Sequence, residues 1–572
     1  MKTFVKMILV VFGLCTYAVS QTYKNEVCIV YSERSGIILD NFSPQTIDNL
    51  ELLCRVWGFL KYYHPAVAAG GYNWDAELFR IMPSVLEAPT SDVRNQALYA
   101  WISQLGEITE FVDYAIEVND EVKMFPDLVW MEDTGRLEHK LVTQLSRVKN
   151  AKRTENNFYA NFLNEEPFPS FIYDDAGLRL LTLFRFWNII QYYFPYRHLT
   201  DNDWNLVLDE YIPKFIDSRT ELDYKLTLLQ LVAEVGNTSA NLIDRLAFDG
   251  IWGNYEIPCL IKFIEGKAII HDAGLFSTDL GDFALKKGDI ITGIGGETIE
   301  EVVEKGLLYT PGSNYSAQLN ELSHRLLRTN STRVEVQLIR KGESHTVSVD
   351  TQPKRWISDK RHIFDDSNTS RLLKPEIGYL FLPTIVDSGS SLSELLEIFM
   401  RTKGIIIDLR SPHNGIAHIF HELCNYFLPE PVEVFTFSTG SSLFPGQFTF
   451  MPSIKIGNEN PGYYKGIVVI IVDEKTFDAS ELLAMAIKKA PRTIIIGSAT
   501  AASTTAVAEV VLPGSIYFRF PRLGIYCPNK QDTQRLGVPI DEVVIQSVNG
   551  IFEERDEFLE RAIEIIEFYT NE

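Results

Sequence analysis

The chain has 572 residues, of which 46% are hydrophobic and 23% charged, a globular composition that excludes a fibrous or wholly disordered protein. This length exceeds what one hydrophobic core supports, so we expect several domains. Acidic residues outnumber basic ones by 76 to 53, for a net charge of −23, which disfavours binding to nucleic acid or to anionic lipid. We therefore expect neutral or basic partners and no nucleic acid.

Residues 1–20 have the pattern of a secretory signal peptide. Lys2 and Lys6 supply positive charge, residues 7–14 form a short apolar stretch, and residues 18–20 form a small-residue cleavage site. The apolar stretch is too short to cross a bilayer, and no later stretch reaches that length. We expect an exported protein, periplasmic, extracellular or associated with the envelope, with no integral membrane segment after signal removal.

The cysteines give no disulfide pattern. Those beyond the signal peptide are Cys28, Cys54, Cys259, Cys424 and Cys527. An odd and scattered set of this kind is not a disulfide framework. We therefore expect hydrophobic cores to stabilise the mature chain.

The sequence contains an internal repeat. Residues 49–107 align without a gap with residues 179–237, at a constant offset of 130. Apolar residues recur every three or four positions in each copy, which predicts helices with an aromatic core rather than a ligand site. We expect the first repeat in an N-terminal domain at 21–165 and the second at 166–255. Matching positions include Arg55 and Arg185, Trp57 and Trp187, Tyr62 and Tyr192, Trp74 and Trp204, and Gly106 and Gly236.

From residue 256 onward, short strands replace the helical pattern. Residues 285–291 read Leu-Lys-Lys-Gly-Asp-Ile-Ile, and a helical stretch is predicted at 297–304. Apolar and polar residues alternate at 334–338, and the chain turns at a Lys-Gly pair and returns at 346–349, which predicts a hairpin.

The segment 256–352 resembles a PDZ domain of bacterial proteases, in which a Leu-Lys-x-Gly-Asp turn precedes an Ile-Ile strand. The resemblance implies that the segment captures a peptide as an added strand, and we expect this contact near Gly274 and Leu275. A phosphate-binding loop is not predicted, because no Gly-rich strand-to-helix turn with a lysine is present.

The last third of the chain, residues 353–572, alternates buried strands with helices. β-Branched runs at 405–407, 467–472 and 494–496 predict strands, and residues 481–490 have a helical composition. This order predicts an α/β layer with a parallel sheet, whose ligands bind beyond the carboxyl ends of the strands.

Two segments follow such strands directly. Residues 408–415 read Asp-Leu-Arg-Ser-Pro-His-Asn-Gly, and residues 476–481 read Thr-Phe-Asp-Ala-Ser-Glu. With Ile-Gly-Tyr-Leu at 377–380 and Leu-Gly-Val-Pro-x-Asp at 536–541, residues 170–570 resemble the tail-specific (C-terminal processing) serine peptidases, in their tricorn-core-like branch. The resemblance implies a multidomain α+β protein with a duplicated helical region, a PDZ-like β domain and a crotonase-like C-terminal α/β domain.

The chain departs from this family at the chemically active positions. In the family, Thr-x-Ser-x-x-Glu supplies a nucleophilic serine, and its base is a Lys about 25 residues later or an upstream His. Here Asp478 stands at the nucleophile position, while Glu481 is retained. The lysine position holds Ser503, and the Thr-His-Ala-Asn motif reads Thr-Ser-Ala-Asn, with Ser239 in place of the base.

We expect the chain to keep the scaffold without hydrolysis. By the resemblance, the oxyanion hole would use backbone N–H groups near Gly415 and Ala479. We expect Asp478 to cap the helix that begins after it, with Glu481 as the partner in a capping pair, and so to occupy those donors. The protein would then bind peptide or unfolded protein segments without cleaving them, and without a cofactor.

Three alternatives remain open. A working serine endopeptidase would need an unorthodox nucleophile; Ser480 is a poor candidate because it lies about 200° around the helix from Asp478. A metal site is conceivable on one helix face, although a partly buried helix explains the same residues. A structural envelope protein is the third. The candidate metal ligands are His413, His418, His421 and Cys424.

Overall fold

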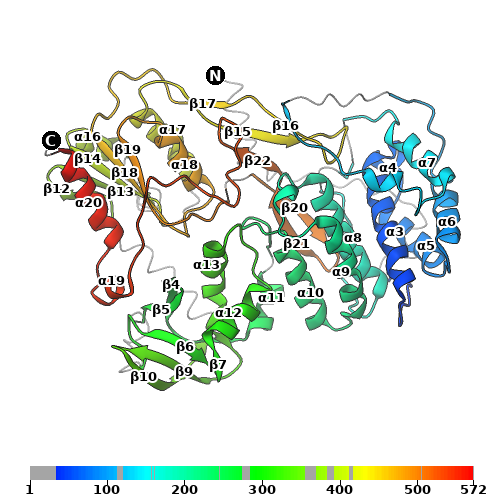
Figure 1. Cartoon of the computed structure of the whole chain (residues 1–572), viewed down its shortest axis with the longest axis horizontal. Helices are drawn as coiled ribbons and strands as arrows, with labels where there is room; N and C mark the ends of the chain where they lie inside the picture. The colour runs from blue at the N-terminus through cyan, green and yellow to red at the C-terminus, as the bar shows by residue number, and fades with distance from the viewer. Residues whose placement is uncertain are drawn as a thin grey trace.

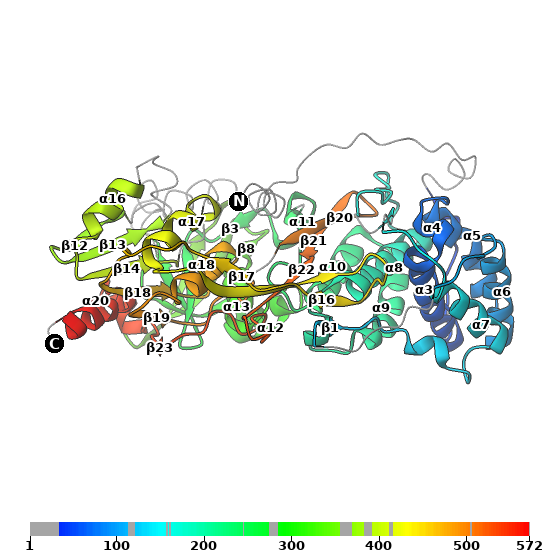
Figure 2. The ribbon, with the colours of Figure 1, turned by 90° about the horizontal axis from the view of Figure 1, so that it is seen from above.

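The computed structural model describes most of the chain. Helices of the N-terminal part lie at one end of an elongated molecule and the C-terminal α/β domain at the other, with a strand-rich unit beside the middle (Figures 1 and 2). None of the helices in the described part combines the length and apolar character that a bilayer crossing requires. The described residues are 34–112, 120–155, 158–159, 162–243, 245–273, 284–354, 369–382, 392–410, 416–503 and 506–570.

The two sequence repeats form the same succession of helices. In each, a long helix is followed by a second that starts at a tryptophan and by a third that is capped by a threonine, Thr90 or Thr220. The offset of 130 is kept at the starts of the second and third helices. The first repeat has α3 (Pro44–Tyr63), α5 (Trp74–Leu86) and α6 (Ser91–Ser103), and the second has α8 (Ala176–Tyr193), α9 (Trp204–Asp217) and α10 (Glu221–Ala233).

Short elements connect and flank these helices. They are α4 (Pro65–Ala68), β1 (Val122–Met124), η1 (Val129–Glu132), α7 (His139–Lys149), η2 (Arg197–Leu199), β2 (Asn241–Leu242) and α11 (Arg245–Trp252).

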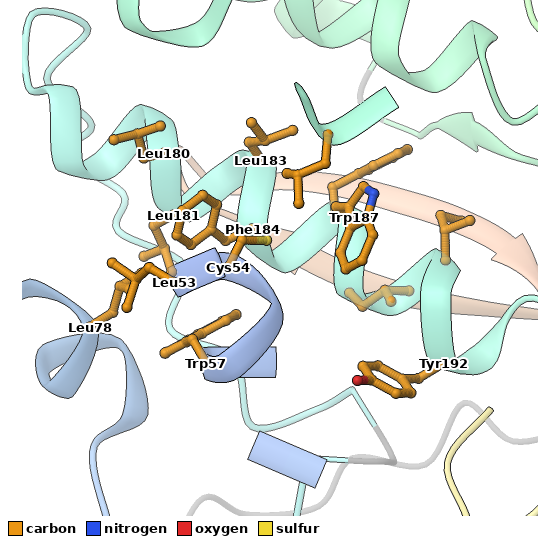
Figure 3. Close-up of a cluster of buried hydrophobic side chains, with 14 of the residues drawn as sticks. Leu53, Cys54, Trp57, Leu78, Leu180, Leu181, Leu183, Phe184, Trp187 and Tyr192 are labelled. Atoms are coloured by element: carbon orange, nitrogen blue, oxygen red, sulfur yellow. The ribbon is translucent and has the colours of Figure 1, made fainter. Parts of the chain in front are cut away.

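Equivalent residues of the two repeats meet where α3 crosses α8. A Cβ atom on Gly58 would lie 1.7 Å from the Asn188 side chain, so the close crossing requires glycine at this point. Positions 58 and 188 correspond in the alignment. Cys54 and Phe184, also equivalent, meet in the same apolar cluster (Figure 3). One core therefore spans both repeats, which predicts that neither folds alone.

The aromatic pairs of the repeats are core residues, as expected. The Trp57 indole N–H donates to the Trp74 carbonyl at 3.0 Å, and the Trp74 indole donates back to the Trp57 carbonyl at 3.0 Å. The second repeat has the same exchange between Trp187 and Trp204, at 2.9 and 3.1 Å. These bonds satisfy the polar edge of each buried indole and join the first helix of each repeat to the second.

The strand-rich unit is built on an antiparallel sheet in the order β10-β9-β6-β5-β4, with β7 paired to β6. Helix α13 packs against β4, which lies at the edge of this sheet among the described strands. Its elements are β4 (Leu260–Ile264), β5 (Lys267–Asp272), β6 (Ile290–Ile294), β7 (Glu297–Thr298), α12 (Ile299–Leu307), α13 (Tyr315–Leu326), β9 (Arg333–Arg340) and β10 (Glu343–Asp350), with a small sheet of β3 (Tyr255–Glu256), β8 (Arg328–Thr329) and β11 (Gln352–Pro353).

The predicted strands of the α/β domain are confirmed. β14 (Gly404–Asp408), β18 (Ile467–Val472) and β19 (Thr493–Gly497) lie parallel in the sheet order β12-β13-β14-β18-β19-β23. Apolar residues of alternate sheet faces belong to two separate cores, one shared with α16, α17 and α18 and the other with α20. The other elements are β12 (Arg371–Lys374), β13 (Ile377–Phe381), α16 (Leu392–Phe399), α17 (Ile416–Phe427), α18 (Ala479–Ile487), β23 (Glu542–Val543), α19 (Val548–Phe552) and α20 (Glu557–Thr570).

A hairpin arm, residues 432–450, joins the α/β domain to the N-terminal helices (Figure 2). It contains β15 (Val432–Gly440) and β16 (Phe448–Phe450), and β16 pairs with β1 of the N-terminal part. The Tyr63 hydroxyl donates to the Pro445 carbonyl at 2.7 Å, which fixes the tip of the arm to α3. β17 (Ile454–Ile456) and β22 (Leu523–Tyr526) also pair with β15.

A second C-terminal segment enters the helical core. β20 (Val507–Leu512) and β21 (Ile516–Pro521) form a small sheet with β2. Phe518 and Phe520 of β21 belong to the same buried cluster as the helices of both repeats. The N-terminal core is therefore completed by residues more than 250 positions later in the chain.

Candidate functional site

Asp478 lies on a sharp turn between β18 and α18. Its backbone has φ +52° and ψ −121°, a conformation that side-chain-bearing residues rarely adopt. A strained strand-to-helix turn of this kind is what presents the nucleophile in hydrolases with a nucleophile elbow. Asp478 therefore has a backbone geometry suited to presenting a nucleophile.

The turn is fixed by contacts with two neighbouring segments. The Thr476 hydroxyl accepts from the Asp473 N–H at 3.1 Å and donates to the Leu409 carbonyl at 2.9 Å. The Asp478 N–H donates to the Ser503 carbonyl at 3.0 Å. Strand ends β14 and β19 thus hold the loop after β18, and these bonds offset the strain at Asp478.

The prediction that Asp478 caps α18 is wrong. Its side chain makes no capping hydrogen bond. A capping residue ordinarily has an extended backbone with negative φ, which brings its oxygen to the N–H groups of the first turn, and Asp478 has φ +52° instead. Ala479 is the first residue of the helix, so its N–H is among those without an intrahelical acceptor.

Glu481 is fully buried and organises the segment after β19. Its carboxylate accepts hydrogen bonds from the Thr500 hydroxyl, from the Ala502 N–H at 2.9 Å and from the Ser503 N–H at 2.8 Å. Burial raises the pKa of Glu481 to about 7, although these hydrogen bonds lower it. The charge of Asp478 raises the pKa further. Glu481 is therefore not the partner of a capping pair; it fixes residues 500–503 instead.

Ser239 and Ser503 lie side by side. Their hydroxyl groups are hydrogen-bonded to each other. The Asn237 side-chain oxygen accepts from the Ser239 N–H at 2.8 Å and so shapes the turn that carries Ser239. The Thr238 hydroxyl donates to the Ala501 carbonyl at 2.9 Å, which ties this turn to the Ser503 segment. The structure thus gathers the positions that the sequence analysis singled out, although they come from three distant segments.

Residues 376–544 match the family described as peptidase family S41. The chain contains a peptidase family S41 domain. The predicted relationship to the tail-specific peptidases is therefore confirmed as an S41 domain over residues 376–544, and the predicted multidomain α+β class is confirmed.

Two solved structures of CPAF show the same fold at low sequence identity. Mature CPAF complexed with lactacystin has a TM-score of 0.54 and 11% identity, over 69% of this chain and 98% of that chain. Mature CPAF alone gives a TM-score of 0.52 at 12% identity, over 68% and 96%. The photosystem II D1 C-terminal processing protease gives 0.39 at 16% identity, over 68% and 97%. No curated protein matches the sequence.

A hydrogen-bonded cluster around Ser313 supports the S41 site and was missed from the sequence. The Ser313 hydroxyl accepts from the Thr238 N–H at 3.0 Å and from the Gln534 amide at 2.7 Å. The Asn314 side chain caps α13 and donates to the Thr500 carbonyl at 2.8 Å. The only sequence signal was the position of Asn314 before a helix and of Gln534 just before the Leu-Gly-Val-Pro motif.

The Asp-Leu-Arg motif at the end of β14 forms an ion cluster. Arg410 bonds Asp408 at 2.6 Å and Asp556 at 2.7 Å, and the Tyr379 hydroxyl donates to Asp408 at 2.8 Å. Burial favours the neutral form of Asp408, but Arg410 holds the pKa of this carboxyl below its ordinary value. The cluster joins the end of β14 to the start of α20 within the S41 domain.

The remaining predicted site residues are either outside the described part of the chain or on another helix, α17. Gly415, Gly274, Leu275 and His413 lie outside the described residues. His418, His421 and Cys424 lie on α17, and the described part of the chain contains no group of three or more potential ligands that could hold a metal. Burial raises the pKa of the Cys424 thiol to about 12, so it packs as an apolar residue. Ser480 is 2% exposed.

A cavity of about 280 Å³ lies where the strand-rich unit meets the S41 domain. Its walls include β4, one face of α13, and Glu474 and Lys475 of the loop that leads to Asp478. Lys262 of β4 bonds Asp473 at 3.3 Å and Glu474 at 3.0 Å. We call this cavity the β4–α13 groove.

Proposed function

We propose that the protein is an exported, non-catalytic member of the tail-specific peptidase family that binds peptide or unfolded protein segments. The observation that carries this proposal is the acid at the elbow: Asp478 has the strained backbone suited to a nucleophile but carries a carboxylate. Beside it, Ser239 and Ser503 occupy the positions of the family's bases and are bonded to each other.

The chemistry of these three groups does not support peptide hydrolysis. A serine-type mechanism needs a hydroxyl nucleophile and a group that accepts its proton near neutral pH. Attack by the Asp478 carboxylate would give an anhydride from a peptide bond, an unfavourable product. The hydroxyls of Ser239 and Ser503 are not bases near neutral pH, and removing one member of such a catalytic unit leaves only residual rates.

The fixed loop at Asp478 supports binding beside this residue. The hydrogen bonds of the Thr476 hydroxyl and of the Asp478 N–H fix the turn at Asp478. In a non-catalytic protein, this fixed turn serves binding. Beside the elbow, the Phe477 side chain is 39% exposed. An exposed apolar side chain and backbone donors on a fixed loop suit contact with an extended polypeptide.

The strand-rich unit supports peptide binding independently. β4 is an edge strand among the described strands, and α13 lies beside it, so the β4–α13 groove offers backbone groups to an added strand and a helix face to its side chains. This arrangement agrees with the PDZ-like resemblance. The signal-peptide pattern of residues 1–20 supports an exported location.

The test compares hydrolysis with binding on the purified mature protein. We expect no cleavage of an unfolded polypeptide such as reduced casein and no labelling by a serine-reactive phosphonate, but saturable binding of fluorescent casein by anisotropy. The double variant Asp478→Ser, Ser239→His should react with the phosphonate faster than the single variant Asp478→Ser, because the imidazole supplies the missing base.

Two results would contradict the proposal. One is cleavage by the wild-type protein that Ser239→Ala or Ser503→Ala abolishes. The other is an absence of casein binding at any concentration that remains soluble. Asp478→Asn is the matched control for the loss of charge at the elbow, since it keeps the size of the side chain.

A further inference from the structure

A second cavity lies at the end of α18 that is far from Asp478. It has a volume of about 340 Å³ and is lined by the last turn of α18, by β15 and β19, and by the loop that follows β22. Because α18 has 9 residues, about 13 Å of helix separate its first turn from this cavity. The cavity is therefore distinct from the site at Asp478. We call it the Cys527 cavity, after the cysteine that lines it.

The floor of the Cys527 cavity is apolar. The apolar side chains come from four segments that are separate in sequence, and these residues are themselves buried, with at most 7% of each exposed. Ligand sites combine such a floor with a small number of polar groups. The floor residues are Val434, Met485, Ile495 and Val538.

The rim of the Cys527 cavity carries lysines and no acid. Lys488 and Lys489 line the cavity together with Asn529 and Gln531, and none of the described lining residues is Asp or Glu. Lys488 already pairs with Asp541. Lys489 makes no ion pair with a described residue. One of the two lysine charges is thus available to a ligand.

The acids that adjoin the lining residues in sequence have other partners. Glu433 lies 3.8 Å from Lys455. Asp532 bonds Lys123 at 3.0 Å. No described carboxylate therefore offsets the charge of Lys489 in a direct contact, and the charge balance at the rim favours an anion.

Lys489 lies close to the thiol of Cys527. Burial raises the pKa of this thiol, and the positive charge of Lys489 opposes the rise. Lys489 also follows the C-terminal end of α18, where the helix dipole favours a cation, so the lysine alone does not indicate a ligand. The indication comes from the combination of an apolar floor, a lining without acids and an unpaired ammonium group at the rim.

We propose that the Cys527 cavity binds a small aromatic carboxylate, with its ring on the apolar floor and its carboxylate at the Lys489 ammonium group. A cavity of about 150 Å³ holds one benzene ring, so about twice this volume admits two fused rings. An aromatic ring is favoured over an alkyl chain, because the Met485 sulfur and the Lys489 ammonium both interact favourably with aromatic rings. This binding is independent of the proposed peptide binding.

Cys527 reports on the occupancy of its cavity. It is partly exposed, whereas Cys54, Cys259 and Cys424 are buried. The test uses the full mature protein with Cys28→Ser, since Cys28 lies outside the described residues. We expect 2-naphthoate, at about ten times the Kd measured by calorimetry, to slow the alkylation of Cys527 by N-ethylmaleimide about tenfold, followed by mass spectrometry.

Lys489→Gln is the decisive variant for the carboxylate. We expect it to weaken 2-naphthoate about tenfold, as for a lost hydrogen bond to a charged group, and to leave the neutral 2-naphthamide unchanged. Lys140→Gln is the matched control, because Lys140 is also exposed, lies on α7 and makes no ion pair with a described residue. Gln531→Trp, at an exposed position of the rim, should obstruct the cavity and weaken both compounds.

Three results would overturn the proposal. The first is that 2-naphthoate neither binds nor protects Cys527. The second is an equal affinity for 2-naphthoate in the wild type and in Lys489→Gln, which would refute the role of the ammonium group. The third is tighter binding of decanoate than of 2-naphthoate, which would show that the floor takes an alkyl chain rather than an aromatic ring.

Discussion

At the scale of single residues, the candidate site rests on a strained backbone at Asp478 and on the buried carboxylate of Glu481. Asp478 has φ +52°, and the retained Glu481 accepts three hydrogen bonds from residues 500–503. Different interactions determine the backbone conformation of Asp478 and the side chain at position 481. The backbone of Asp478 is set by its neighbours, whereas Glu481 is required by the N–H groups that it satisfies.

The pH dependence of stability tests the burial of Glu481. Its pKa is about 7 in the folded state and 4.5 ordinarily, so the folded protein binds the proton more tightly than the unfolded chain. The free energy of unfolding must therefore fall as pH rises from about 4.5 to 7, by about 3 kcal/mol from this group.

Urea unfolding of wild type and Glu481→Gln at pH 5 and pH 8 measures this effect. The variant lacks the titrating carboxyl, so its free energy of unfolding should fall less over this interval than that of the wild type, by about 3 kcal/mol. A parallel pH trend in the two proteins would show that Glu481 titrates normally.

At the scale of elements, the two repeats exchange equivalent polar contacts. Arg185 of the second repeat bonds Asp75 of the first at 2.7 Å, and Arg55 of the first donates to Asn205 of the second at 2.7 Å. Positions 55 and 185 correspond in the alignment, as do 75 and 205. This reciprocity is what a pseudo-twofold relation between two copies predicts, and it explains why α3 and α8 cross at equivalent residues.

A buried ion cluster joins only the Arg185–Asp75 contact of these two. Glu165 lies 2.7 Å from Lys61 and 3.1 Å from Arg185, and all three side chains are at most 1% exposed. Removing one charge from such a cluster leaves an uncompensated charge in the core.

We expect Glu165→Gln to lower the free energy of unfolding by about 3–5 kcal/mol, measured by urea unfolding with the fluorescence of the buried tryptophans. Lys61→Met combined with Glu165→Leu should cost less than the two single changes summed, since it removes both charges. Glu221→Gln, which breaks an exposed pair with Lys225 on α10, is the control and should cost about 1 kcal/mol or less. Equal losses in Glu165→Gln and Glu221→Gln would contradict the role of the cluster.

At the scale of the whole molecule, the hairpin arm makes the N-terminal helices and the S41 domain one unit (Figure 2). The Arg153 side chain donates to the Leu443 carbonyl at 2.8 Å and lies over the Tyr63 ring, 4.8 Å from its centre. Because β20 and β21 also complete the helical core, two separate C-terminal segments anchor the helices. This mutual dependence predicts cooperative unfolding of the two parts.

The contact of Arg153 with the arm is open to a direct test. We expect Arg153→Met to accelerate amide hydrogen exchange at residues 441–447 by about tenfold or more, because a charged hydrogen bond and a cation–π contact are lost. Arg147→Met, in α7 and away from the arm, should leave exchange in this segment unchanged. Equal exchange in the two variants would show that other contacts hold the arm.

Much of the fold and part of the site could be predicted from the sequence. The β-branched runs at 405–407 and 467–472 predicted buried strands, and the offset of 130 located equivalent helices. The motif around Asp478 predicted a loop between a buried strand and a helix, since a β-branched run precedes it and a helical composition follows it. These signals are local, because periodicity, strand ends and helix starts are encoded within a few neighbouring residues.

Only the tertiary structure decided how the site is held. Asp478 does not cap α18, because the hydrogen bonds of Thr476 and of the Ser503 carbonyl fix its backbone in a conformation with positive φ. These long-range bonds outweigh the local preference of an aspartate for the capping position. The cluster of Thr238, Ser313 and Gln534, the arm and the β4–α13 groove each join residues that are far apart in sequence. No local pattern marks these contacts, since their partners become neighbours only when the cores pack.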